Sequence, residues 1–179
     1  MIRMLPRSLL ALAIASACLP WQALAQAAPA ATDASSTLAA RDIPLLEGAI
    51  EIDGRLDDAG WANARSMDIG FEISPGDNLP APVKTTVRVG HTQDALYISY
   101  RALDPDPSAI RAHLRDRDAA FNDDFVGMML DTFDDQRRAY EFFVNPFGVQ
   151  MDLIKEEATG NEDSSWDGLW SSAGRLVAD

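Results

Sequence analysis

The sequence has few of the residues on which thiol and metal chemistry depend. Of its 179 residues, one is a cysteine, Cys18, and two are histidines, His91 and His113. A single cysteine cannot form a disulfide framework or a cysteine-ligated zinc site, and Cys18 lies in a leader that we expect to be removed. The two histidines are too isolated to form a zinc pair. No Ser/His/Asp order and no glycine-rich phosphate loop is present.

Basic residues are also scarce. The chain has 15 Lys and Arg residues against 28 Asp and Glu residues, which gives a formal net charge of −13. Nucleic-acid binding depends on Lys and Arg side chains that neutralise phosphates, so this balance excludes a nucleic-acid module. An anionic membrane surface would repel the chain for the same reason.

A continuous apolar stretch of the length that a membrane-spanning helix requires, about 20 residues, is absent. Residues 1–25 instead have the features of a secretory signal peptide, with an early basic charge, an apolar run over 9–15 and Ala23-Leu24-Ala25 as the cleavage site. An alternative is lipidation of Cys18, since residues 15–18 resemble a weak lipobox. Residues 26–42, rich in Ala, Ser, Thr and Pro, predict a flexible tether. We therefore expect export to the periplasm, the outer membrane or the cell surface.

From residue 43 onward, apolar side chains recur mainly at every second position, as in half-buried strands. Residues 125–131 and 139–145 predict one pair of strands, and residues 132–138 predict the exposed loop between them. Asn145-Pro146-Phe147-Gly148 predicts a turn, with a return strand over 149–154. Two further runs, joined by a turn at 91–94, predict a hairpin: Val83, Thr85, Val87 and Val89, then Leu96, Ile98 and Tyr100.

Only two short helical pieces are indicated. One is capped by Asp57 and turns Trp61 inward, and the other runs from Ser108 to Arg115. Many short strands separated by turn signals predict an all-β fold over residues 43–179, an antiparallel, jelly-roll-like β-sandwich. The last residues resemble a strand that enters a turn, so we expect the sandwich to be incomplete where the printed sequence ends.

Several ordered motifs resemble the family 9 carbohydrate-binding module. They are Ile52-Asp53-Gly54-Arg55-Leu56-Asp57-Asp58-Ala59-Gly60-Trp61, the strand pair over 87–98, and Asp124-Phe125-Val126-Gly127-Met128-Met129-Leu130-Asp131. The resemblance is closer to exported bacterial proteins in which such a module precedes an outer-membrane β-barrel. The motifs of that group appear here as Leu130-Asp131-Thr132-Phe133, Arg137-Arg138-Ala139-Tyr140, residues 144–150 and Trp166-Asp167-Gly168-Leu169-Trp170.

The resemblance implies a sugar held between two indole rings, with polar groups around it. At the first indole position this chain has Phe121, and the second indole would fall beyond Asp179. The family's glutamate is replaced by Gly127. Of the family's Arg-x-Asn, Phe143 replaces the arginine and Asn145 is retained. Phe121 and Asn145 are therefore the carbohydrate contacts that the resemblance implies.

Two further sets of residues are candidates for binding. Trp166 and Trp170, four residues apart, would face the same side of an extended segment, either as a stacking surface for a glycan or as part of the core. Family 9 modules commonly hold structural Ca²⁺, and calcium takes six to eight oxygen ligands. Asp104, Asp106 and Asp124 are the candidate ligands, and a solvated acidic surface is the alternative.

The function expected from these features is binding rather than catalysis, because no buried acid is indicated of the kind that glycoside hydrolysis needs. The chain would be an exported carbohydrate-binding module associated with polysaccharide breakdown or uptake at the cell envelope. In many family members the module is attached to a xylanase-like glycoside hydrolase. The alternative is a structural or interaction domain that contacts its own outer-membrane barrel and has lost the sugar site.

Overall fold

The computed structural model describes residues 42–74 and 76–177. The predicted signal peptide, Cys18 and all of the predicted tether except Asp42 lie outside the described residues. Within them, no helix is both long enough and apolar enough to cross a membrane.

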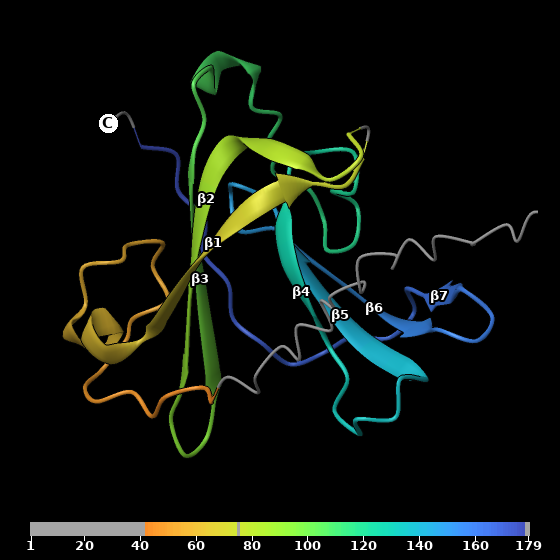
Figure 1. Cartoon of the computed structure of the whole chain (residues 1–179), viewed down its shortest axis with the longest axis horizontal. Coiled ribbons are helices and arrows are strands. Elements are labelled where there is room, and N and C mark those ends of the chain that lie inside the picture. Colours follow the sequence, from red (N-terminus) through yellow and green to blue (C-terminus); the bar gives the residue numbers. More distant parts are fainter. Residues whose placement is uncertain (1–41, 75, 178–179) are drawn as a thin grey trace, which may run out of the picture. The chain divides into compact units, whose positions relative to one another are not determined.

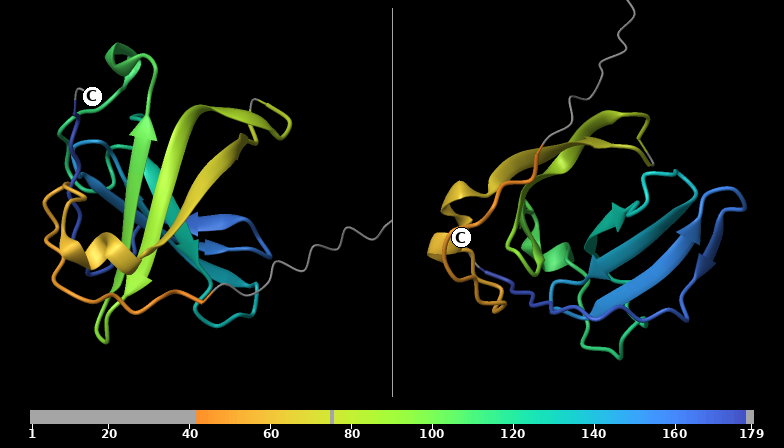
Figure 2. Two further views of the ribbon diagram at one scale, coloured as in Figure 1. Left: turned by 60° about the vertical axis from the view of Figure 1, so that its left-hand side comes forward. Right: turned by 90° about the horizontal axis from the view of Figure 1, so that it is seen from below.

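The described residues form two antiparallel sheets, which confirms the predicted all-β sandwich. Sheet A has the order β1-β2-β3 and sheet B the order β4-β5-β6-β7. The two sheets form separate layers (Figures 1 and 2). Sheet A comprises β1 (Arg65–Glu72), β2 (Leu79–His91) and β3 (Leu96–Leu103). Sheet B comprises β4 (Val126–Leu130), β5 (Arg138–Val144), β6 (Gln150–Glu156) and β7 (Asn161–Asp163).

The hairpins follow the alternating pattern of the sequence. In the β2–β3 pair, Val87 lies opposite Tyr100 and Val89 opposite Ile98. The Thr92 amide closes the turn by donating to the Ala95 carbonyl over 2.8 Å. In sheet B, β5 pairs with both β4 and β6 in the predicted order. The β2–β3 pair forms because the apolar residues of each strand lie on one face, and a single turn brings these two faces together.

The helical predictions are only partly correct. The first piece is a 3-10 helix, η1 (Ala59–Asn63), and its N-cap residue is Asp58, whose side chain makes no capping hydrogen bond. The predicted cap at Asp57 is therefore wrong. Trp61 is buried at 6% exposure, as predicted.

The predicted helix from Ser108 to Arg115 is wrong. Only Pro107–Ala109 forms a short 3-10 turn, η2, and Ile110 after it is extended. The reason lies in tertiary hydrogen bonds. The Arg111 amide donates to the Asp124 carboxylate over 2.9 Å, and the His113 amide donates to Asp123 over 2.8 Å. Amides held by distant side chains are not available for the bonds of a helix.

Each sheet contributes buried residues, and a hydrogen bond from β3 to β4 links the two sheets. Val87 and Val89 are buried in sheet A, and Met151 and Leu153 are buried in sheet B. The Tyr100 hydroxyl on β3 donates to the Gly127 carbonyl on β4 over 2.7 Å. Burial raises the pKa of Tyr100 to about 12, so the hydroxyl remains a donor across the physiological range.

Candidate functional site

Phe121 lies at the corner of a turn that precedes β4. The Asp123 amide closes this turn by donating to the Ala120 carbonyl over 2.9 Å. Phe121 is 39% exposed and Phe125 is 43% exposed, and their rings meet edge to face with centroids 6.2 Å apart. Both rings also contact Phe143, at 6.1 and 5.3 Å. The two half-exposed rings of Phe121 and Phe125 thus pack against the ring of Phe143.

Phe143 connects this aromatic group to the core of sheet B. It packs against a buried cluster of Ala120, Val149 and Met151. A Cβ atom added to Gly127 would overlap Cδ1 of Phe143 and the Phe142 carbonyl oxygen, so the ring occupies part of the space that any larger residue at position 127 would need. The two replacements of family residues therefore fit each other. Gly127 and Phe143 form an apolar surface at the positions where the resemblance would place a glutamate and an arginine.

Asn145, the retained polar residue of the resemblance, is 2% exposed and supports the loops around it. Its Nδ2 donates to the His113 carbonyl over 2.8 Å and to the Asp123 carboxylate over 3.0 Å. Its Oδ1 accepts from the amides of Phe147 and Val149, at 3.0 and 2.9 Å. All four of its side-chain hydrogen-bonding positions are filled. A glycan contact by this amide would require one of these bonds to break.

Asp123 and His113 form a pair that the sequence alone did not reveal. Asp123 is 4% exposed, and its Oδ1 lies 2.7 Å from Nδ1 of His113. The hydrogen bond from the His113 side chain is the main cause that lowers the pKa of Asp123 to about 2, and Asn145 adds to it. The imidazole itself is 59% exposed. A charged carboxylate thus orients a histidine whose remaining edge faces solvent.

The second pair of predicted contacts lies on the other face of sheet B. The Trp166 ring packs against Tyr140 and Phe142, with centroids 5.0 and 5.7 Å away, and the Trp170 ring lies 5.5 Å from Phe142. Phe142 and Phe143 are adjacent in β5, so their side chains point to opposite faces. The structure brings Trp166 and Trp170 together, as expected, but does not bring them to Phe121 and Asn145.

Trp170 is held in place by a buried carboxylate. Its Nε1 donates to Oδ2 of Asp152 over 2.6 Å, and the Gly168 amide donates to the same oxygen over 3.2 Å. Asp152 has no exposed surface and also pairs with the Arg117 guanidinium. Arg117 in turn donates to the Gly168 carbonyl over 2.8 Å. This network fixes the segment 166–170 against β6.

The structure places the three candidate calcium ligands in local contacts. Asp104 accepts from the Asp106 amide over 2.8 Å, and Asp106 accepts from the Ser108 hydroxyl over 2.6 Å. Asp124 pairs with the Arg111 guanidinium at 3.1 Å. Calcium at these residues stays a prediction.

Acidic side chains gather elsewhere, around a cation of the chain itself. Among the described residues, the group whose oxygens lie within 4.8 Å of one another is Asp118, Asp152 and Asp167. The Arg117 guanidinium contacts all three, with Nε 3.0 Å from Asp167 and 3.8 Å from Asp118. Arg117 therefore already supplies positive charge to this group.

Comparisons with known protein families, with curated proteins and with solved structures found no match to this chain. The resemblance to family 9 modules therefore rests on the motifs in the sequence. The fold and the contacts define the class of protein as a two-sheet antiparallel sandwich with aromatic side chains on both faces of one sheet.

Proposed function

We propose that this protein is a non-catalytic carbohydrate-binding module. The observation that carries the proposal is the pair of half-exposed rings, Phe121 and Phe125, supported edge to face by Phe143. An aromatic face on a rigid base is what the apolar face of a pyranose stacks on. The turn from Ala120 to Asp123 and the packing of Phe143 limit the motion of the rings, which lowers the entropy lost on binding.

His113 is the polar partner in this proposal. Asp123, two residues after Phe121, holds both the amide and Nδ1 of His113, at 2.8 and 2.7 Å. The exposed imidazole can hydrogen-bond a sugar hydroxyl through its other nitrogen. The imidazole would supply some of the polar contacts that the family's glutamate and arginine would make and that Gly127 and Phe143 cannot make.

Binding is proposed rather than hydrolysis because neither Glu141 nor Asp123 suits the role of a glycosidase acid. Burial raises the pKa of Glu141, but this side chain is only 4% exposed, and Asp123 is ionised. A glycosidase needs one carboxylic acid with a raised pKa to protonate the leaving group. The pKa of Asp123 is lowered to about 2 by its hydrogen bonds, so it is charged at neutral pH and serves to orient His113. In this proposal the chain is exported and assists polysaccharide breakdown or uptake at the cell envelope, alongside a glycoside hydrolase such as a xylanase.

The proposal is tested by titrating the full chain with a panel of soluble plant and bacterial glycans in a calorimeter. Phe121→Ala should weaken binding about tenfold, which corresponds to the loss of one aromatic contact. Phe133→Ala is the matched control, because Phe133 is 72% exposed in the loop between β4 and β5. Equal affinities of the Phe121→Ala variant and the wild type would contradict the proposal.

A second candidate function is a structural or interaction domain that has lost its sugar site. Two observations favour it: the Phe143 ring fills the space over Gly127, and the Asn145 amide has no free hydrogen-bonding position. Its partner would be the outer-membrane barrel that the resemblance implies. This candidate predicts that the folded wild-type chain binds no glycan of the panel. Folding is verified in the same sample by a cooperative urea transition.

A further inference from the structure

A second aromatic surface lies on the face of sheet B opposite to Phe143. The half-buried Trp166 ring meets the Tyr140 ring with centroids 5.0 Å apart and an interplanar angle of 53°. Trp170, beyond Phe142, is engaged by Asp152 through its indole nitrogen. Trp166 has no such bond to a described residue. Of the two tryptophans, Trp166 is therefore the one whose indole N–H is open to a ligand.

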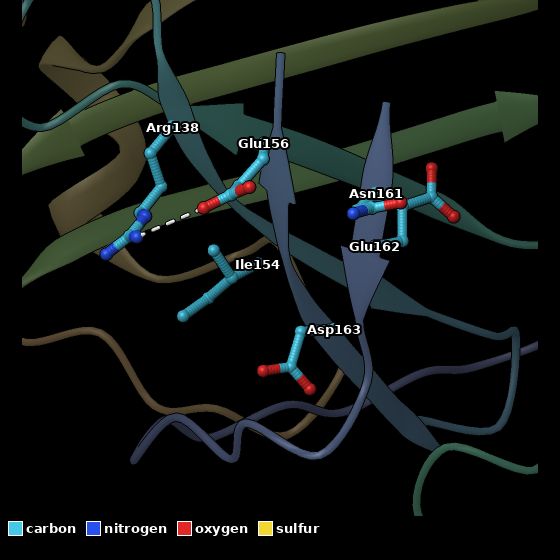
Figure 3. Close-up of a pocket in the computed structure, with 6 residues that line it drawn as sticks. All are labelled: Arg138, Ile154, Glu156, Asn161, Glu162 and Asp163. Carbon is cyan, nitrogen blue, oxygen red and sulfur yellow. Dashed lines mark hydrogen bonds and ion pairs between the residues drawn. The ribbon is translucent and has the colours of Figure 1, made fainter. Parts of the chain in front are cut away.

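A hollow of about 340 Å³ adjoins this surface (Figure 3). Its lining residues are Arg138, Ile154, Glu156, Asn161, Glu162 and Asp163. The strand register shows that the hollow and the rings share one face of the sheet. Tyr140 on β5 lies directly opposite Ile154 on β6, and Ile154 lies opposite Asp163 on β7. The rings and the hollow are therefore neighbouring parts of one surface.

Three polar side chains of the hollow, Arg138, Glu156 and Asn161, are at least partly exposed, and Arg138 and Glu156 are only loosely paired. Nη2 of Arg138 lies 3.4 Å from Oε1 of Glu156, and these side chains are 51% and 47% exposed. Asn161 lies opposite Glu156 in the register. Figure 3 shows the Glu162 carboxylate pointing away from Arg138 and Glu156, and it pairs with Lys155 at 3.4 Å. A guanidinium, a carboxylate and an amide offer donors and acceptors for neighbouring hydroxyl groups.

Asp163 connects the hollow to Trp166. Its Oδ1 accepts from the amide and the hydroxyl of Ser165, at 3.0 and 2.6 Å. These bonds close a tight turn immediately before Trp166, and they lower the pKa of Asp163, which keeps the carboxylate charged. The turn therefore fixes the position of Trp166 relative to β7.

We propose that Trp166 and Tyr140, together with Arg138, Glu156 and Asn161, form a second saccharide-binding surface of this protein. A pyranose ring stacks beside the two aromatic rings while its hydroxyls reach the three polar side chains. The ligand is a neutral oligosaccharide. Carboxylates outnumber Arg138 in the lining of the hollow, so a uronic-acid chain or another anion is repelled. This surface is independent of the Phe121 site, because it lies on the opposite face of sheet B.

The test uses the full chain and two neutral probes, cellohexaose and xylohexaose, with trigalacturonate as the anionic probe. The variant carries Arg138→Ala and Asn161→Ala together. Both residues are exposed and the Arg138 ion pair is solvated, so the substitutions leave the fold intact. Arg137→Ala is the matched control, since it removes the same charge from the neighbouring exposed residue. Calorimetric titration gives the affinity of each chain for each probe.

We expect the double substitution to weaken binding of a neutral hexasaccharide about tenfold, and Arg137→Ala to leave it unchanged. Trigalacturonate should bind the wild type more weakly than either neutral probe. A neutral probe should also change the tryptophan fluorescence, and Trp166→Phe should remove that change while keeping a ring beside Tyr140. Unaltered affinity in the double variant, a fluorescence change that persists in Trp166→Phe, or no binding by the wild type would each overturn the proposal.

A background that carries Phe121→Ala and Phe125→Ala separates this surface from the first site. If the second surface exists, this background still binds a neutral probe and still shows the Trp166 signal. If only the Phe121 site binds, the background loses all binding and the Arg138 variant is indistinguishable from wild type, which overturns the second surface alone. If only the second surface binds, the Phe121 and Phe125 substitutions have no effect, which overturns the function proposed for Phe121 alone.

Discussion

The ring of Phe143 lies so close to Gly127 that a Cβ atom at position 127 would overlap Cδ1 of the ring. Phe143 and Gly127 face each other directly across β4 and β5. Packing therefore requires a glycine at position 127. The position of the Phe143 ring, which supports Phe121 and Phe125, depends on this glycine.

Gly127→Glu should destabilise the protein by about 1–3 kcal/mol, because the larger side chain must displace the Phe143 ring. Urea denaturation measures the loss. The double variant Gly127→Glu with Phe143→Arg restores the pair that the resemblance implies. It should lose less stability than the sum of the two single variants, since the positions are in contact. Additive losses would show that the ring and the glycine are not coupled.

The stability of the protein should depend on Asp123 at acid pH. Its pKa is about 2 in the folded protein and 3.8 in the ordinary reference state. A lowered folded pKa means that the charged carboxylate stabilises the fold. This contribution is complete above the unfolded value and is lost as the pH falls through the folded value.

Urea denaturation of wild type and Asp123→Asn between about pH 5 and pH 2 measures this contribution. The difference in unfolding free energy between the two proteins should shrink as the pH falls. An exposed control, Asp116→Asn, should show a smaller change over the same range. A constant difference between wild type and Asp123→Asn would show that the His113 and Asn145 bonds do not stabilise the charged form.

Removing the Asp152 carboxylate should lower the free energy of unfolding of the protein. Asp152→Ala leaves the Arg117 guanidinium and the Trp170 indole without their buried partner, and breaking a buried ion pair costs about 3 kcal/mol or more. The near-ultraviolet circular dichroism of Trp170 should change as well. Asp167→Asn is the control: its side chain is 68% exposed, so its pair with Arg117 contributes less than about 1 kcal/mol. Equal losses from both variants would contradict the network.

Calcium at Asp104, Asp106 and Asp124 predicts that a chelator lowers the melting temperature, because a bound ion stabilises the folded state by mass action. Thermal unfolding with and without excess EDTA measures this shift. Asp124→Asn should abolish the chelator effect. A melting temperature that EDTA leaves unchanged would contradict the predicted calcium site.

Much of the fold follows from local patterns in the sequence. Alternation of apolar side chains predicted the β2–β3 hairpin, and Pro146 with Gly148 predicted the turn between β5 and β6, which closes with a 2.9 Å bond from the Gly148 amide to the Asn145 carbonyl. These features depend on residues close in the chain, so no distant contact is needed to read them. The failed helix from Ser108 to Arg115 shows the limit, since Asp123 and Asp124 hold its amides from a later segment.

The candidate sites, like the fold, were predictable only where they depend on residues close together in the sequence. The sequence by itself determined that Trp166 and Trp170 share a side of one segment, because their spacing decides it once the segment is extended. The sequence could not determine that Trp166 packs against Phe142 while Phe121 packs against Phe143, on the opposite face of sheet B. Nor could it determine that all hydrogen-bonding positions of the Asn145 amide are filled within the protein. Only the tertiary structure decided these points. Which polar groups remain open to a ligand depends on partners that lie tens of residues away in the chain.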